Sequence, residues 1–199
     1  MAHHALSFLD CPNPKKAFQF WYEYILGFES KFWPAPTAWN VVRDEPDYPE
    51  NLVYINNGLL IVCINLVGGA IHDEKEWQTR QAADLAWIDE NYYKYEGQFD
   101  AMVILAHSDP DNEDNAMFFD TFYDRVGNDY SEQVIYIHRN PALKKWSLEP
   151  EYNDISNLIV VVVEGDLWPP MLVQIDTKAG VVDIDQDGWY TKYMNGELV

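Results

Sequence analysis

Three apolar runs separated by helical patterns constrain the fold of this chain more than any other feature. The runs are LLIVCINLV, AMVILA and QVIYI, which begin at Leu59, Ala101 and Gln133. Between them, residues 74–96 and 115–126 place apolar side chains at helical spacing. Alternating buried strands and helices predict a layered sheet with helices packed on it.

Local signals mark where several elements begin. Asn13 and Pro14 suit the N-cap and first position of a helix over residues 14–28. Asp73, with Glu76 three residues later, forms a capping-box-like start for the helix over residues 74–96. Both helices are therefore expected to begin at these caps.

Turn residues organise the remaining strands. Asn57-Gly58 between apolar runs predicts a β-hairpin, whereas the proline-rich residues 32–50 predict a loop. The last third of the chain holds the runs NLIVVVVEG, PMLVQID and GVVDIDQDG, the last two joined around TKAG. We expect a single α/β (α+β) domain over residues 1–199, a layered β-sandwich flanked by helices.

The charge balance limits the partners of the chain. It carries 33 acidic and 13 basic residues, a net charge of −20. Such a field repels nucleic acids and anionic membrane surfaces, so neither is an expected partner, and it attracts cations. No apolar run approaches the roughly 20 residues of a membrane helix. Acidity favours an extracellular setting slightly over the cytoplasm, and the sequence carries no address signal.

Two buried-looking runs end in a histidine. His107 follows MVILA, and His138 closes QVIYIH. Ligand groups gather at the carboxyl ends of strands in α/β sheets, and two imidazoles there could hold a divalent metal ion. Asp109 adds a carboxylate two residues after His107. The sequence thus predicts a metal site of His107, His138 and Asp109; the alternative is that both histidines merely close their strands.

A second pattern resembles the start of a calcium loop. Asp183, Asp185 and Asp187 alternate along DIDQDG and are followed by Gly188, as oxygen ligands and a turn glycine would be. Position twelve is Met194, where the pattern requires a glutamate. The alternative is a strand with two aspartates on its wet face and a turn at Asp187 and Gly188.

The order of these motifs resembles a known family. NGLLIVCINLVGG, HDEKEWQTRQAADLAWIDE, DAMVILAHSDP and QVIYIH are similar to the carboxyl-terminal half of calcineurin-like metallophosphoesterases, from about Asp10 to the end of the chain. The resemblance implies a four-layered sandwich of two sheets flanked by helices. It also implies two metal ions (Mn, Fe or Zn) that activate a hydroxide against a phosphoester.

The same resemblance shows what is missing. His107 matches the strand-end ligand of the fourth motif, and His138 alone matches the fifth, which normally carries a second histidine. The third motif is replaced around Leu6, and the two amino-terminal motifs, Asp-x-His and Gly-Asp-x-x-Asp, are absent. The chain is therefore a degenerate remnant, a fragment of a longer hydrolase, or a half-site that a partner completes.

Two functions follow as expectations. The first is a metallophosphoesterase-like pseudoenzyme with little or no phosphoester hydrolysis on its own. The second is an acidic binding or scaffold module that binds calcium through Asp183, Asp185 and Asp187. Because an incomplete sandwich leaves apolar strands such as LIVVVV to be covered, we also expect a homo-oligomer or a partner chain that completes the sheet.

Overall fold

The computed structural model describes residues 13–26, 41–68, 71, 73–139, 146–163, 171–185 and 188–197. Its strands are β1 (Val42–Asp44), β2 (Tyr48–Asn56), β3 (Leu59–Cys63), β4 (Ala101–Leu105), β5 (Gln133–Arg139), β6 (Ser147–Pro150), β7 (Leu158–Val163), β8 (Leu172–Asp176) and β9 (Val181–Asp185). Its helices are α1 (Pro14–Phe20), η2 (Trp21–Ile25), α3 (Glu74–Lys94), η3 (Glu113–Asn115), α4 (Ala116–Asn128), η4 (Tyr152–Asp154) and α5 (Gly188–Met194).

A seven-stranded mixed sheet forms the centre of the fold, in the order β1-β2-β3-β4-β5-β7-β6. The neighbouring strands β3, β4, β5 and β7 run parallel to one another. The pairs β1–β2, β2–β3 and β6–β7, at the two ends of the sheet, are antiparallel. The carboxyl ends of the four parallel strands therefore meet at one edge. The expected α/β class, a sheet flanked by helices, is confirmed.

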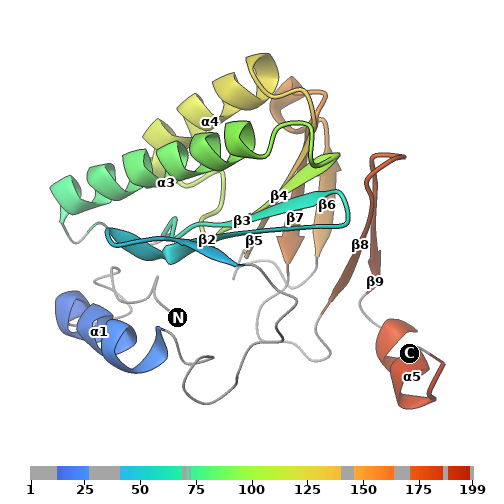
Figure 1. The fold of residues 1–199 in the computed structure, drawn as a ribbon, viewed down its shortest axis with the longest axis horizontal. Coiled ribbons are helices and arrows are strands. Elements are labelled where there is room, and N and C mark those ends of the chain that lie inside the picture. Colours follow the sequence, from blue (N-terminus) through green and yellow to red (C-terminus); the bar gives the residue numbers. More distant parts are fainter. Residues whose placement is uncertain are drawn as a thin grey trace.

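The helices α3 and α4 lie side by side over one face of this sheet (Figure 1). Their buried aromatic and aliphatic side chains pack on the alternate strand residues that point to this face. The largest fully buried side chains of this core are Tyr92 on α3, Phe118, Phe119 and Phe122 on α4, and Tyr136 on β5. No helix in the described part of the chain is long and apolar enough to cross a membrane.

The opposite face is covered by the β8–β9 hairpin. Buried Ile135 and Val161 of the large sheet contact a cluster that includes Ile175, Val182 and Ile184 of the hairpin. As a result β7, the run LIVVVV, lies between β5 and β6 and has cover on both faces. The cover that the sequence predicts for this strand comes from the chain itself.

The predicted caps and turn are confirmed. The Lys16 backbone N–H donates to Asn13 Oδ1 at 3.1 Å, and the Glu76 N–H donates to Asp73 Oδ1 at 3.1 Å. Asn57 and Gly58 both have positive φ, 51° and 77°, as the tight turn of a hairpin requires. These local signals succeeded because each depends only on neighbouring residues.

The prediction of a loop over residues 32–50 is wrong for residues 42–50, which hold β1, a turn and the start of β2. Proline breaks a strand only where its missing N–H would have to pair, and Pro46 lies in the turn between the two strands. Pro49 lies beside the register shift between Arg43 and Asp44. Its missing N–H therefore costs the sheet no hydrogen bond. Residues 27–40 of the predicted loop and helix end lie outside the described residues.

Candidate functional site at the strand ends

His107 and His138 reach the same edge of the sheet but opposite faces of it. Leu105 of β4 is paired with Ile137 of β5, so His138 is level with the residue after Leu105. His138 shares the helix-covered face with Tyr136, and the two ring centroids lie 5.6 Å apart. The alternation of β4, continued by two residues, places His107 on the other face.

The two imidazoles consequently line different cavities. His107 lines an open cavity of about 260 Å³ with Leu105, Ala106 and residues 64–66. Its Nδ1 atom also lies 3.3 Å from where a Cβ atom on Gly68 would stand. The structure therefore does not bring His107 together with His138.

His138 lines a second cavity of about 80 Å³, which we call the strand-end cavity. The floor is formed by Val160 and Val162 of β7. Polar groups of β5, β6, η4 and the segment after β4 complete the lining: His138, Glu149, Tyr152 and the loop Asp109–Asp111. Of the three residues predicted for a metal site, His138 and Asp109 meet here.

His138 is buried, with 2% of its surface exposed, and no described group hydrogen-bonds its Nδ1 atom. Burial lowers the pKa of the imidazole below its ordinary value, against the opposing effects of Asp109, the Arg139 backbone and Asp111. At neutral pH the ring is therefore uncharged. A neutral imidazole nitrogen is a hydrogen-bond acceptor and a metal ligand.

The acidic loop has a defined local geometry. The backbone N–H of Asp111 donates to Asp109 Oδ1 at 3.0 Å, an Asx-turn that fixes one carboxylate against its own chain. The Tyr152 hydroxyl donates to Asp111 Oδ1 at 3.2 Å. Burial and the nearby Asp111 raise the pKa of Tyr152 to about 12, so the phenol keeps its proton as a donor. The ring of Tyr123 lies 6.1 Å from the ring of Tyr152.

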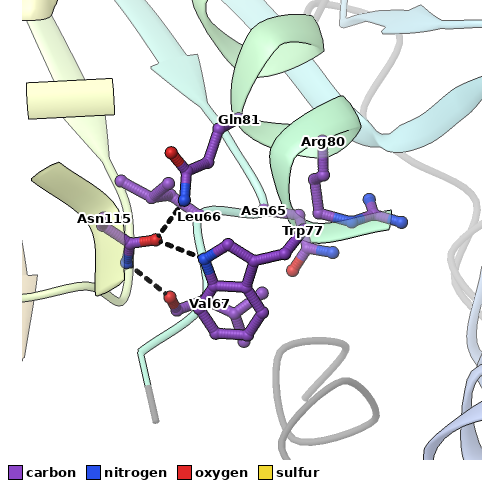
Figure 2. Close-up of a pocket in the computed structure, with 7 residues that line it drawn as sticks. All are labelled: Asn65, Leu66, Val67, Trp77, Arg80, Gln81 and Asn115. Atoms are coloured by element: carbon purple, nitrogen blue, oxygen red, sulfur yellow. Dashed lines mark hydrogen bonds between the residues drawn. The ribbon is translucent and has the colours of Figure 1, made fainter. Parts of the chain in front are cut away.

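Asn115, which lies just before α4, hydrogen-bonds with Trp77, Gln81 and Val67, as Figure 2 shows. Its Oδ1 atom accepts from Trp77 Nε1 at 2.9 Å and from Gln81 Nε2 at 2.8 Å. Its Nδ2 atom donates to the Val67 carbonyl at 2.7 Å and to Ser108 Oγ at 2.6 Å. The adjoining cavity has only about 10 Å³ of space, about one water molecule. This buried group therefore positions the loop and offers little room for a ligand.

Two aspartates of the calcium-loop pattern accept hydrogen bonds from nearby backbone N–H groups. Asp185 Oδ1 accepts the Gly188 backbone N–H at 2.7 Å and so caps the start of α5. Asp183 Oδ1 accepts the N–H of Ile184 at 3.0 Å. Asp187 lies outside the described residues. Gly188, which we expect in a turn, is instead the first residue of the short helix α5.

Sequence reasoning missed two residues of the strand-end cavity, Glu149 and Tyr152. Both lie around Pro150, in a segment of β6 and η4 with no apolar run and no helical spacing. Only the pairing of β6 with β7 brings them beside His138. The thiol of Cys63 on β3 is no nucleophile, because burial raises its pKa to about 11 and keeps it protonated.

Among the residues that the structure describes, no three His, Cys, Asp or Glu side chains are grouped closely enough to hold a metal ion together. Comparisons with protein-family models, with curated proteins and with solved structures give no match.

Proposed function

We propose that this chain is a metallophosphoesterase-like protein with an incomplete hydrolytic set, which acts as a binding module for a cationic ligand at the strand-end cavity. One observation carries the proposal. His138 Nδ1 is buried without a described partner in a cavity whose lining includes the carboxylates of Asp109, Asp111 and Glu149. A buried polar atom without a partner costs free energy that a bound ligand would recover.

The residues fit one cation better than a two-metal centre. A two-metal phosphoesterase site needs several ligands that converge on ions about 4 Å apart. His107, which the resemblance assigns to such a centre, lines the other cavity. A divalent ion (Mn, Fe or Zn) at the strand-end cavity would instead be held by His138 and Asp109, and it would supply Lewis-acid chemistry there.

Calorimetric titration at pH 7.5 with MnCl₂, ZnCl₂, CaCl₂ and small amines tests the proposal. We expect one saturable cation site that His138→Gln abolishes and that the matched variant His107→Gln retains. Circular dichroism melting of both variants checks that each still folds. The proposal is overturned if none of these cations binds at a saturable site. It is also overturned if the site is lost in His107→Gln alone.

A separate measurement tests the proposal that the chain has little or no phosphoester hydrolysis. With p-nitrophenyl phosphate and Mn²⁺, we expect a rate no higher than that of His138→Gln. A metal-dependent rate that disappears in this variant would identify an active hydrolase and refute the pseudoenzyme.

We also propose that a second copy or a partner chain pairs with an edge of the sheet. The edges in the described residues are β1 and β6, each with one unpaired side. Size-exclusion chromatography with light scattering should show a mass above that of the single chain. A stable monomer across a hundredfold dilution range contradicts this association.

A further inference from the structure

The geometry of the strand-end cavity points to the class of its ligand: we propose that it binds a small organic ammonium ion with a short aliphatic stem. This inference rests on the proposed cation-binding function and makes it specific. It follows from the apolar floor, from the spacing of the polar walls, from their charge and from the size of the cavity.

The floor is suited to an aliphatic group. Val160 and Val162 lie two residues apart on β7, point to the same face and are only 2% and 5% exposed. A hydrated metal ion gains nothing from contact with two isopropyl groups. A chain of methylene groups gains about 0.8 kcal/mol for each methylene buried.

The polar walls stand on opposite sides of this floor. Val162 is paired with His138 on β5 and with Ser147 on β6, and Val160 is likewise paired with Glu149. Since neighbouring strands are about 4.8 Å apart, β5 and β6 are separated by roughly 10 Å. A ligand several atoms long can reach both sides of the floor, whereas a single ion cannot.

The charge of the walls selects an ammonium group. Asp109 and Asp111 lie in the loop after β4, Glu149 lies on β6, and no lysine or arginine is among the described lining residues. The ring of Tyr152 adds an aromatic face, which attracts cations. An ammonium N–H can also donate to the uncharged imidazole of His138. Carboxylates on two separate elements, Asp109 in the loop after β4 and Glu149 on β6, favour a short diamine over a monoamine.

The size excludes larger cations. At about 80 Å³, the cavity is well below the 300–1,000 Å³ of a typical drug-sized site. Its enclosed volume is too small for a nucleotide. A stem of about four carbon atoms spans the roughly 10 Å between the walls when both nitrogen atoms and their hydrogen-bond partners are included.

Calorimetric titration with 1,4-diaminobutane and with butylamine tests this inference, at about 150 mM NaCl so that the general field is screened. We expect both probes to bind at one site and the diamine to bind more tightly. Asp109→Asn should weaken both about tenfold. Glu149→Gln should weaken the diamine about threefold and leave butylamine unchanged, because only the diamine has a second ammonium group.

The charge-matched controls are Asp120→Asn on the exposed side of α4 and Glu151→Gln, neither of which lines the cavity. Both should bind the diamine like the parent chain. Equal weakening by the controls would mean general charge attraction and would overturn the inference. Binding of Mn²⁺ or Ca²⁺ that requires His138, without amine binding, would refute the ammonium ligand and leave the cation-binding function standing. Absence of binding by metals and amines alike refutes both.

Discussion

The side-chain amide of Asn51 on β2 donates a 2.8 Å hydrogen bond to the carboxylate of Asp84 on α3, and both residues are fully buried. Asn51 Oδ1 in turn accepts the backbone N–H of Asn65 at 2.9 Å, just after β3. This chain of contacts connects helix, sheet and strand-end loop. The second carboxylate oxygen of Asp84 has no described hydrogen-bond partner, so its charge is poorly compensated.

Asp84 should make stability depend on pH. Burial raises its pKa from 3.8 to about 7. A raised folded-state pKa contributes stability that is complete below the unfolded value and is lost as pH rises through 7. We expect urea unfolding to show about 2 kcal/mol more stability at pH 5.5 than at pH 8 from this group. Asp84→Asn, which can still accept from Asn51, should remove that difference and stabilise the protein at pH 8. An unchanged pH dependence in the variant contradicts the assignment.

Asn115→Ala should be strongly destabilising. The substitution leaves Trp77 Nε1 and Gln81 Nε2 without their side-chain acceptor, and it removes the donor to Val67 and Ser108. Trp77 Nε1 and Gln81 Nε2 keep the Asp114 carbonyl as an acceptor at 3.1 Å, whereas the Val67 carbonyl and Ser108 Oγ lose a donor. Since a buried group that loses its partner costs about 1–3 kcal/mol, we expect a loss of about 2 kcal/mol in urea unfolding. Asn128→Ala, an exposed asparagine on α4, is the matched control and should change stability by less than about 0.5 kcal/mol. Similar losses in both would show that Asn115 is no anchor.

Gly58→Ala should cost more stability than Gly97→Ala. Both glycines have positive φ, 77° and 73°, so both variants carry the same backbone strain. A Cβ atom at Gly58 would stand 2.6 Å from Asp100 Oδ2, which accepts a hydrogen bond from Thr177 of the β8–β9 turn, whereas nothing lies within 4 Å at Gly97. The difference in melting temperature isolates this contact. Equal shifts would mean that Asp100 moves aside without cost.

Ile175→Asp should detach the β8–β9 hairpin without unfolding the sheet. Ile175 packs against the large sheet, whereas Val181 is 54% exposed. We expect amide hydrogen exchange in β8 and β9 to become at least about tenfold faster in Ile175→Asp, with β4 and β5 unchanged. Val181→Asp should leave exchange as it is. Unchanged protection in Ile175→Asp would show that the hairpin is held by other contacts.

The sequence was a good guide wherever a signal is local or periodic. The caps at Asn13 and Asp73, the turn at Asn57 and the apolar runs all predicted their elements. It also correctly placed His107 and His138 at one edge, because parallel strands end together. It could not show on which face of the sheet each histidine lies, because that depends on the register of β4 with β5 and on where each strand ends.

The missed part of the site has a physical cause as well. Glu149 and Tyr152 flank Pro150, and β6 is four residues long with no buried residue. Such an edge strand is specified by its neighbour β7 rather than by its own pattern. A single sequence carries no signal for that pairing, so these two residues of the strand-end cavity could not be anticipated.

Both crossover helices lie on the same face, so β3, β4 and β5 follow one another across the sheet without a reversal of order. Open α/β sheets form a crevice where that order reverses, and these three strands provide none. The cavity instead lies past α4, where β6 turns back against β7. Loss of β6 would therefore spare the parallel core and remove one wall of the cavity, so the proposed ligand site depends on a four-residue edge strand.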